Sequence, residues 1–280
     1  MGRNKRKKKA ASATKPALTA KNADKYRLYE KSVQDPAFDI RFIRRVFKKE
    51  SGRDPLTLRE DFCGTGLFSA LWVNGNRQRR AWGLDLDAKT LAYGQRTHLE
   101  PLGDAAERAQ LLQRDVLEGG PEPVDVAVAF NFSYCILQTR PTLLRYFQVA
   151  REGLHPDGAF FLDIHGGPEA QMETEERKNV DGFTYVWDQQ PMDAISGQAK
   201  RHIHFEFKDG SRLKRAFSYD WRVWTLPEIK DVLEEAGFQR VDVYWEGADE
   251  NGEGNGIFRK VKRAQNEDSW IAYVVAWRTG

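Results

Sequence analysis

The chain has 280 residues, of which 40% are hydrophobic, which is enough for one large domain with a sizeable core. Its net charge of +3 includes eight Lys and Arg residues within the first 21 positions, so the remainder of the chain carries −5. That balance argues against a basic body built for nucleic acid. No run of about 18 apolar residues occurs, so the sequence predicts no membrane span.

The two cysteines, Cys63 and Cys135, are too few for a disulfide framework and lack metal-ligand spacing. We therefore expect no metal site and a reducing, cytoplasmic location. Residues 1–22 are rich in Lys, Arg, Ala, Ser and Thr and predict a disordered basic tail. Residues 23–280 are expected to form one domain. Within it, apolar residues spaced by three and four over 23–54 predict two helices.

From Leu58 to Ile164, short apolar runs alternate with helical patterns, which predicts a parallel sheet covered on both faces. The pattern then changes to alternating runs over 183–187, 199–207 and 213–221. These predict an antiparallel insertion over residues 180–222, with a hairpin turn at 208–211. Two further strands, at 241–245 and 270–277, flank a polar segment that is expected to be a loop.

The segment Glu60-Asp61-Phe62-Cys63-Gly64-Thr65-Gly66 lies between a predicted strand and a predicted helix. Two glycines one residue apart allow backbone to approach a ligand where a Cβ would collide. The segment after Cys63 partly fits the dinucleotide fingerprint, so a nicotinamide enzyme is an alternative. Glu60 argues against it, because the pyrophosphate of such a cofactor occupies the helix N-terminus and disfavours a nearby carboxylate.

Three acids, Glu60, Asp85 and Asp115, end three successive predicted strands, where parallel sheets bind their ligands. Asp85 follows Gly66 by 19 residues, the usual position of a ribose-binding acid. Asp115 is suited to accept a hydrogen bond from an exocyclic adenine amine, while the Val116 backbone N–H donates to the ring. Glu60 is expected to face a ligand amino group.

This arrangement resembles the class I S-adenosylmethionine-dependent methyltransferases that act on small molecules. Glu60 to Gly66 is similar to the family's acidic-x-Gly-x-Gly-x-Gly loop, with Phe62 in place of its first glycine. The segments 83–87, 154–158 and 235–238 match further motifs of the family in the usual order. The resemblance implies an α/β, Rossmann-like fold. Its sheet would have seven mostly parallel strands, helices on both faces and the antiparallel insertion after strand five.

The resemblance also implies S-adenosylmethionine as cofactor and methyl transfer to a small-molecule nucleophile by in-line displacement. Residues 23–54 would then act as a helical lid, and the insertion would cover the active site. The side chains and backbone groups expected at the cofactor are Tyr26, Tyr29, Glu60, Phe62, Gly64, Gly66, Asp85, Leu86, Asp115, Val116 and Asn131. A protein that binds the cofactor for regulation, without transferring methyl, is an alternative.

On the acceptor side, Asn131-Phe132-Ser133-Tyr134 follows the fourth strand and resembles the Asn-Pro-Pro-Tyr motif of enzymes that methylate nucleobase amines. A nucleobase or nucleic-acid methyltransferase that uses the basic tail is therefore the alternative function. Candidate catalytic residues are Asn131, Tyr134 and His165, the last as a general base or a structural residue. The residues expected to contact substrate are Tyr134, His165, Trp187, Tyr219, Arg222 and Trp224, with Arg222 as a carboxylate clamp.

Overall fold

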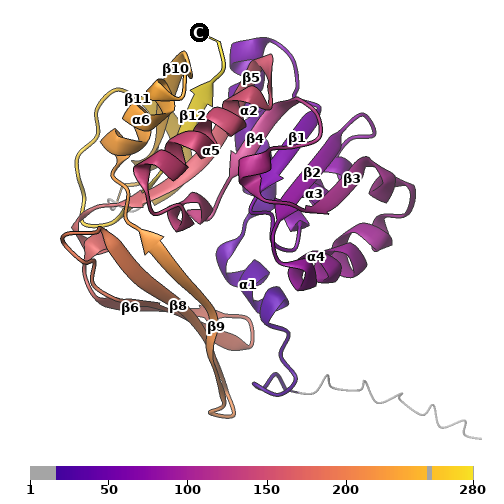
Figure 1. The fold of residues 1–280 in the computed structure, drawn as a ribbon. Coiled ribbons are helices and arrows are strands. Elements are labelled where there is room, and N and C mark those ends of the chain that lie inside the picture. The colour runs from indigo at the N-terminus through magenta and orange to yellow at the C-terminus, as the bar shows by residue number, and fades with distance from the viewer. Residues whose placement is uncertain (1–16, 251–253, 280) are drawn as a thin grey trace, which may run out of the picture.

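The structure, a computed structural model, describes residues 17–250 and 254–279. They form a large sheet with helices on both faces and a smaller antiparallel sheet that projects from one end (Figure 1). The predicted tail over residues 1–22 lies mostly outside the described residues. No helix in the described part of the chain is both long and apolar enough to cross a membrane.

The large sheet has eight strands in the order β11-β10-β12-β5-β4-β1-β2-β3. The strands from β1 to β5 pair in parallel, whereas β12 pairs antiparallel with β5 and β10 pairs antiparallel with β12. The strands are β1 (Thr57–Asp61), β2 (Arg80–Asp85), β3 (Ala109–Gln113), β4 (Val124–Ala129), β5 (Leu154–Gly166), β10 (Arg240–Ala248), β11 (Gly254–Val261) and β12 (Trp270–Trp277). The strand order reverses between β1 and β4, so the carboxyl ends of these strands form the switch point.

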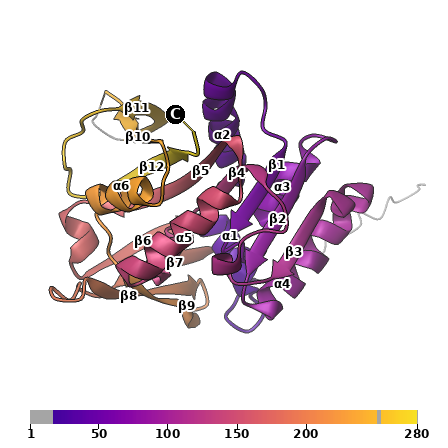
Figure 2. The same cartoon turned by 45° about the horizontal axis from the view of Figure 1, so that its top comes forward.

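Both faces of the large sheet are buried, as the apolar run in β4 predicts. Val126 and Val128 face one hydrophobic cluster, and Ala127 and Ala129 face the other. α2 and α3 pack in the first cluster, and α5 and α6 pack in the second (Figure 2). The helices are α1 (Lys25–Val33), α2 (Pro36–Ser51), α3 (Leu67–Asn74), α4 (Ala88–Gly94), α5 (Arg140–Glu152) and α6 (Leu226–Glu235).

Helix starts follow the capping signals of the sequence. The Asp87 carboxylate accepts from the backbone N–H groups of Lys89 and Thr90, and the Thr139 hydroxyl caps α5. Thr225 and Glu228 form a reciprocal capping box at the start of α6. These caps position the helices on both faces of the sheet.

The small sheet has four strands, β6 (Thr174–Val180), β7 (Phe183–Gln189), β8 (Gln198–Phe207) and β9 (Arg212–Arg222), in chain order. The hairpin between β8 and β9 confirms the predicted turn, where the Phe207 N–H bonds to the Ser211 carbonyl. α1 packs against this sheet through Leu28 and Tyr29 (Figure 1). α1 therefore connects the insertion with the large sheet.

Two strand predictions were wrong. The antiparallel insertion begins at Thr174 rather than 180, because β6 pairs along its whole length with β7. The segment 247–268, expected to be a loop, contains β11, which adds an eighth strand to the predicted seven. Most side chains in β6 and β11 are exposed and many are polar, so neither strand has the apolar alternation that marks a half-buried strand.

Candidate active site

The loop after β1 has the backbone conformation that its glycines predict. Gly64 and Gly66 have φ angles of 53° and 64°. A Cβ on Gly66 would lie 2.4 Å from a side-chain carbon of Leu111, so larger residues are excluded there. A Cβ on Gly64 would meet no atom nearer than 3.9 Å, so the space in front of Gly64 is open.

Phe62 occupies the position of the family's first glycine and adopts the same left-handed region, with φ 56°. This conformation is strained for a side chain of this size. The Phe62 ring contacts the ring of Tyr146, with 5.6 Å between centroids, and packs against the core. The replacement therefore keeps a glycine-like backbone while its aromatic side chain joins the core.

The three predicted acids lie at the carboxyl ends of the adjacent strands β1, β2 and β3. The buried Glu60 carboxylate accepts from the Ser69 N–H at 2.9 Å and from the Ser69 hydroxyl at 2.6 Å. Burial raises the pKa of Glu60 to about 7, and repulsion from Asp85 and Asp61 adds to the increase. The hydrogen bonds from Ser69 act in the opposite direction and lower the pKa of Glu60.

Asp85 and Asp115 each accept hydrogen bonds from backbone N–H groups. Asp85 accepts from the N–H groups of Gly64 at 2.8 Å and Asp87 at 2.9 Å, so it fixes the glycine loop against β2. Asp115 accepts from the Leu117 N–H at 2.9 Å through Oδ1. Val116 beside it is buried, whereas Leu86 after β2 is 64% exposed.

α1 contacts the glycine loop through a residue that the sequence did not indicate. Glu30 accepts a 2.6 Å hydrogen bond from the Thr65 hydroxyl, and its same oxygen lies 2.7 Å from Nε2 of His98. Tyr26 on the same helix accepts from the Thr90 hydroxyl and stacks near Tyr93, with 4.7 Å between ring centroids. α1 thus spans the loop after β1 and the start of α4.

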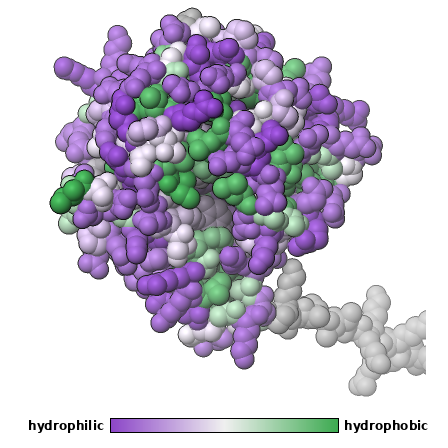
Figure 3. All heavy atoms as spheres, viewed as in Figure 1, coloured by the Kyte–Doolittle hydropathy of each residue, from purple (hydrophilic) through white to green (hydrophobic). Residues whose placement is uncertain are grey.

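A cavity of about 610 Å³ lies beside this region. Its walls come from α1, α2, the ends of β4 and β5, the insertion strands and β12. Of the predicted residues, Tyr29, Asn131, His165, Trp187 and Tyr219 line it. The space-filling view shows a recess between the lobe of the large sheet and the lobe of the insertion (Figure 3).

At the floor of the cavity, Asp163 on β5 accepts from the backbone N–H groups of Asn131 and Phe132, both at 2.9 Å. Asn131 and Phe132 both have left-handed backbone, with φ angles of 58° and 57°. Asp163 therefore stabilises a tight turn after β4 without the prolines of the Asn-Pro-Pro-Tyr motif. Burial raises the pKa of Asp163 to about 7.

His165 also lines the cavity, and its Nε2 lies 3.1 Å from the Ser269 hydroxyl. Burial, with a smaller contribution from Arg201, lowers the pKa of His165. The imidazole is therefore neutral at pH 7, the protonation state that a general base requires.

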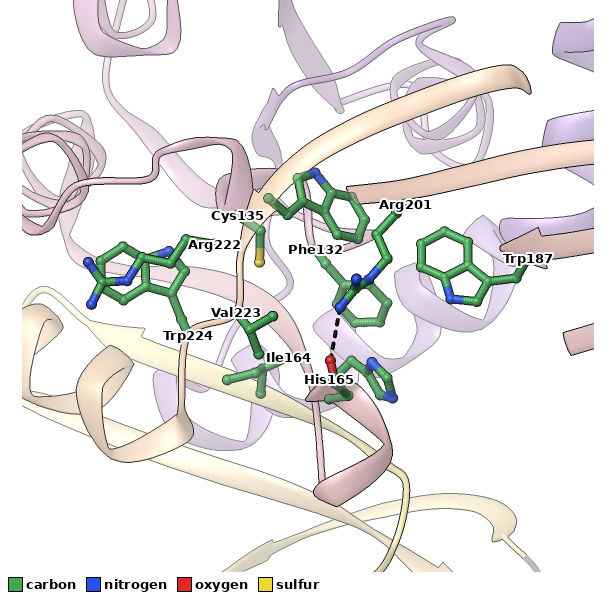
Figure 4. Close-up of a pocket in the computed structure, with 11 residues that line it drawn as sticks. Phe132, Cys135, Ile164, His165, Trp187, Arg201, Arg222, Val223 and Trp224 are labelled. Atoms are coloured by element: carbon green, nitrogen blue, oxygen red, sulfur yellow. Dashed lines mark hydrogen bonds between the residues drawn. The ribbon is translucent and has the colours of Figure 1, made fainter. Parts of the chain in front are cut away.

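The structure does not place three of the predicted substrate residues at the large cavity. Tyr134 is fully buried in the core and lines neither this cavity nor a smaller one of about 30 Å³. Arg222 and Trp224 line only the smaller one. The Arg222 guanidinium stacks on the Trp224 ring at 3.8 Å, away from His165 and Trp187 (Figure 4), and pairs with Glu228.

Arg222 is thus stacked and paired within the protein itself, and its role as a carboxylate clamp stays a prediction. Conversely, no sequence motif indicated Asp39 on α2, which lines the large cavity and accepts a 2.7 Å hydrogen bond from the Tyr273 hydroxyl on β12. The described residues contain no group of three or more His, Cys, Asp or Glu side chains arranged to hold a metal ion.

Comparison with solved structures identifies the fold. An S-adenosylmethionine-dependent methyltransferase from Clostridium acetobutylicum has a TM-score of 0.69 at 16% identity, over 91% of this chain and 98% of that one. The CcbJ methyltransferase from Streptomyces caelestis has a TM-score of 0.64 at 15% identity, over 89% of this chain and 100% of that one.

A SAM-bound amino pentose methyltransferase of calicheamicin biosynthesis from Micromonospora echinaspora has a TM-score of 0.63 at 15% identity, over 91% of this chain and 96% of that one. No protein-family model and no curated protein sequence matches the chain. The chain therefore has the fold of S-adenosylmethionine-dependent methyltransferases, recognisable in three dimensions despite low sequence identity.

Proposed function

We propose that the protein is an S-adenosylmethionine-dependent methyltransferase that acts on a small molecule. The observation that carries this proposal is one arrangement: a glycine loop and three acids lie at adjacent strand ends, and α1 links that loop to a cavity of about 610 Å³. The fold shared with solved methyltransferases supports it, and one of those structures, the amino pentose methyltransferase, contains S-adenosylmethionine.

The residues present fit this cofactor. The space in front of Gly64 is open, and Asp85 has lone pairs left for ribose hydroxyls, since a carboxylate accepts about four hydrogen bonds. Oδ2 of Asp115 has no hydrogen-bond partner among the described residues and is available to an adenine amine. The exposed Leu86 side chain offers an apolar surface to the same nucleoside.

The cofactor would supply an electrophilic methyl group on a sulfonium, so the protein must mainly position a neutral nucleophile and exclude water. In this proposal α1 acts as a lid, because its Glu30 bonds Thr65 of the loop while its Tyr29 lines the cavity. The insertion closes the opposite side with Trp187 and Tyr219. His165, which is neutral at pH 7, lines the same cavity.

The alternatives find less support. A nicotinamide cofactor would require its pyrophosphate near the start of α3, where the Glu60 carboxylate already binds the Ser69 N–H. A nucleic-acid substrate would have to approach a body with a net charge of −5, and the densest run of basic residues in the sequence lies in the tail. The two free thiols support the further proposal of a reducing, cytoplasmic location.

Calorimetry with S-adenosylmethionine tests the cofactor. We expect wild type to bind it and Asp85→Ala to bind at least about 10-fold more weakly, since one good hydrogen bond to a charged group contributes roughly 1.5–3 kcal/mol. Glu122→Gln, at an exposed turn remote from the site, is the matched control and should bind like wild type. Absence of binding by wild type, or equal binding by Asp85→Ala, contradicts the cofactor assignment.

A screen for release of S-adenosylhomocysteine across small-molecule acceptors then separates a methyltransferase from a regulatory binder. A gel shift at several salt concentrations, with and without residues 1–21, tests the nucleic-acid alternative. We expect no salt-dependent shift from the folded body alone.

A further inference from the structure

The large cavity lies where an acceptor would have to bind. On α1, Glu30 bonds the glycine loop and the adjacent Tyr29 lines the cavity. Asn131 and Phe132, which also line it, follow β4, the direct neighbour of the strand that leads into the loop. No residue of the glycine loop lines the cavity itself, but α1 both contacts the loop and lines the cavity.

The charges that line this cavity are mostly negative. Its two basic side chains are Lys178, which is exposed at the rim, and His165, which is neutral at pH 7. Its carboxylates are Asp35, Asp39, Asp163, Glu176 and Glu246. None of the five forms an ion pair with a described residue.

Two of these carboxylates are held inside the cavity by the fold. Asp163 is only 9% exposed and receives two backbone N–H bonds, and Asp39 receives the Tyr273 hydroxyl at 2.7 Å. Burial raises the pKa of both, Asp39 to about 6 and Asp163 to about 7, and each is raised further by a neighbouring carboxylate. Placing like charges together in a partly buried site is unfavourable unless a cation accompanies them.

The remaining walls are aromatic and include Phe38, Phe130, Trp187 and Trp221. Aromatic faces attract cations, and the attraction is stronger where water is excluded. Carboxylates and aromatic rings that line one cavity together are the environment that an organic ammonium ion prefers. An acceptor whose reacting group is a carboxylate would be repelled by the same lining.

On the basis of the proposed function, we infer that the methyl acceptor is an amine, bound as its ammonium ion between Asp163, Asp39 and the aromatic walls, and that Asp39 takes its proton. The N–H bond breaks with its electron pair staying on nitrogen, and the proton forms an O–H bond with the Asp39 carboxylate. The nitrogen lone pair then forms the N–C bond while the methyl C–S bond breaks, its electron pair going to sulfur. The Tyr273 hydroxyl holds the Asp39 carboxylate in position for this transfer.

Binding of matched ligands tests the inference without relying on turnover. Tyramine and tyrosol share one skeleton and differ in an amine and a hydroxyl, as do tryptamine and tryptophol. We expect the protein, saturated with S-adenosylhomocysteine, to bind at least one amine 10-fold or more tightly than its alcohol in NMR titrations at pH 7. Equal affinity within both pairs, or binding of none of the four, overturns the inference.

The variant Asp39→Asn removes the charge but keeps an oxygen that can accept from Tyr273, so its fold should be retained, as a thermal melt can check. We expect it to lose most of the preference for the amine while binding the alcohol unchanged. Glu122→Gln, which removes the same charge at a remote exposed site, should keep the preference. An unchanged preference in Asp39→Asn contradicts the role of Asp39.

Calorimetry with S-adenosylmethionine distinguishes a failure of this inference from a failure of the proposed function. If the protein binds the cofactor but shows no preference for amines, the inference fails and the proposed function stands. If it does not bind the cofactor, the proposed function fails, and the amine preference is then measured on the protein alone.

Discussion

Glu60 accepts hydrogen bonds that hold the start of α3, and its pKa is raised. Its carboxylate accepts from both the N–H and the hydroxyl of Ser69, which fixes the first turn of α3. Burial nevertheless raises the pKa of Glu60 to about 7, so in the free protein the side chain is about half protonated at pH 7. A cationic ligand group nearby would favour the carboxylate and lower this pKa.

We therefore predict that S-adenosylmethionine binding releases protons near pH 7 and that its affinity rises with pH between about 6 and 8. The sign follows because the free protein holds the proton below pH 7 and the complex does not. Calorimetry at pH 7 in two buffers with different ionisation enthalpies measures the release. Glu60→Gln, which can still accept from Ser69, should show equal heats in both buffers; equal heats for wild type would contradict the prediction.

Residue by residue, the sequence predicted the positions of the strand-end acids better than those of the residues around the large cavity. Glu60, Asp85 and Asp115 could be found because strand ends and glycine spacing are local signals. Asp39 and Asp163 could not be found in this way. Each is held by a partner far away in the sequence, Tyr273 for Asp39 and the turn at Asn131 for Asp163. Tyr134 was misplaced because a motif match gives a position in the chain but not the direction of a side chain.

At the scale of elements, buried strands were predictable and exposed ones were not. β4 is apolar at every position except Asp125 because both of its faces are covered by helices. β6 and β11 lie at sheet edges, with most of their side chains exposed, so their pairing depends on backbone hydrogen bonds that leave no hydrophobic period. The capping signals at α4, α5 and α6 were reliable because each acts within a few residues.

The hydrogen bond between Glu30 of α1 and Thr65 of the glycine loop allows the proposed lid role of α1 to be tested. A single Glu30 oxygen receives the Thr65 hydroxyl at 2.6 Å and lies 2.7 Å from His98. We predict that Glu30→Gln weakens S-adenosylmethionine binding about 10-fold, since a hydrogen bond to a charged group contributes roughly 1.5–3 kcal/mol. Lys31→Gln, at the exposed next position of the helix, is the control in calorimetry and should bind like wild type. If both variants bind alike, α1 does not act as a lid.

At the scale of the whole molecule, α1 contacts the insertion and the glycine loop of the large sheet, and both sheets contribute walls to the cavity. Leu28 and Tyr29 pack against the insertion, while Glu30 reaches the glycine loop of the large sheet. The cavity takes its walls from both sheets, so a ligand within it would contact α1, β8 and β9 together. Local opening of these elements should therefore depend on whether the site is filled.

We predict that S-adenosylhomocysteine and tyramine together slow amide hydrogen exchange in α1, β8 and β9 by about 10-fold or more, because a bound ligand opposes their separation from the large sheet. α6 serves as the internal control, since none of its residues lines the large cavity. Exchange followed by mass spectrometry resolves these segments. Equal slowing in α6 and α1 would indicate global stabilisation only, and no slowing in α1 would contradict the coupling of the two sheets through the site.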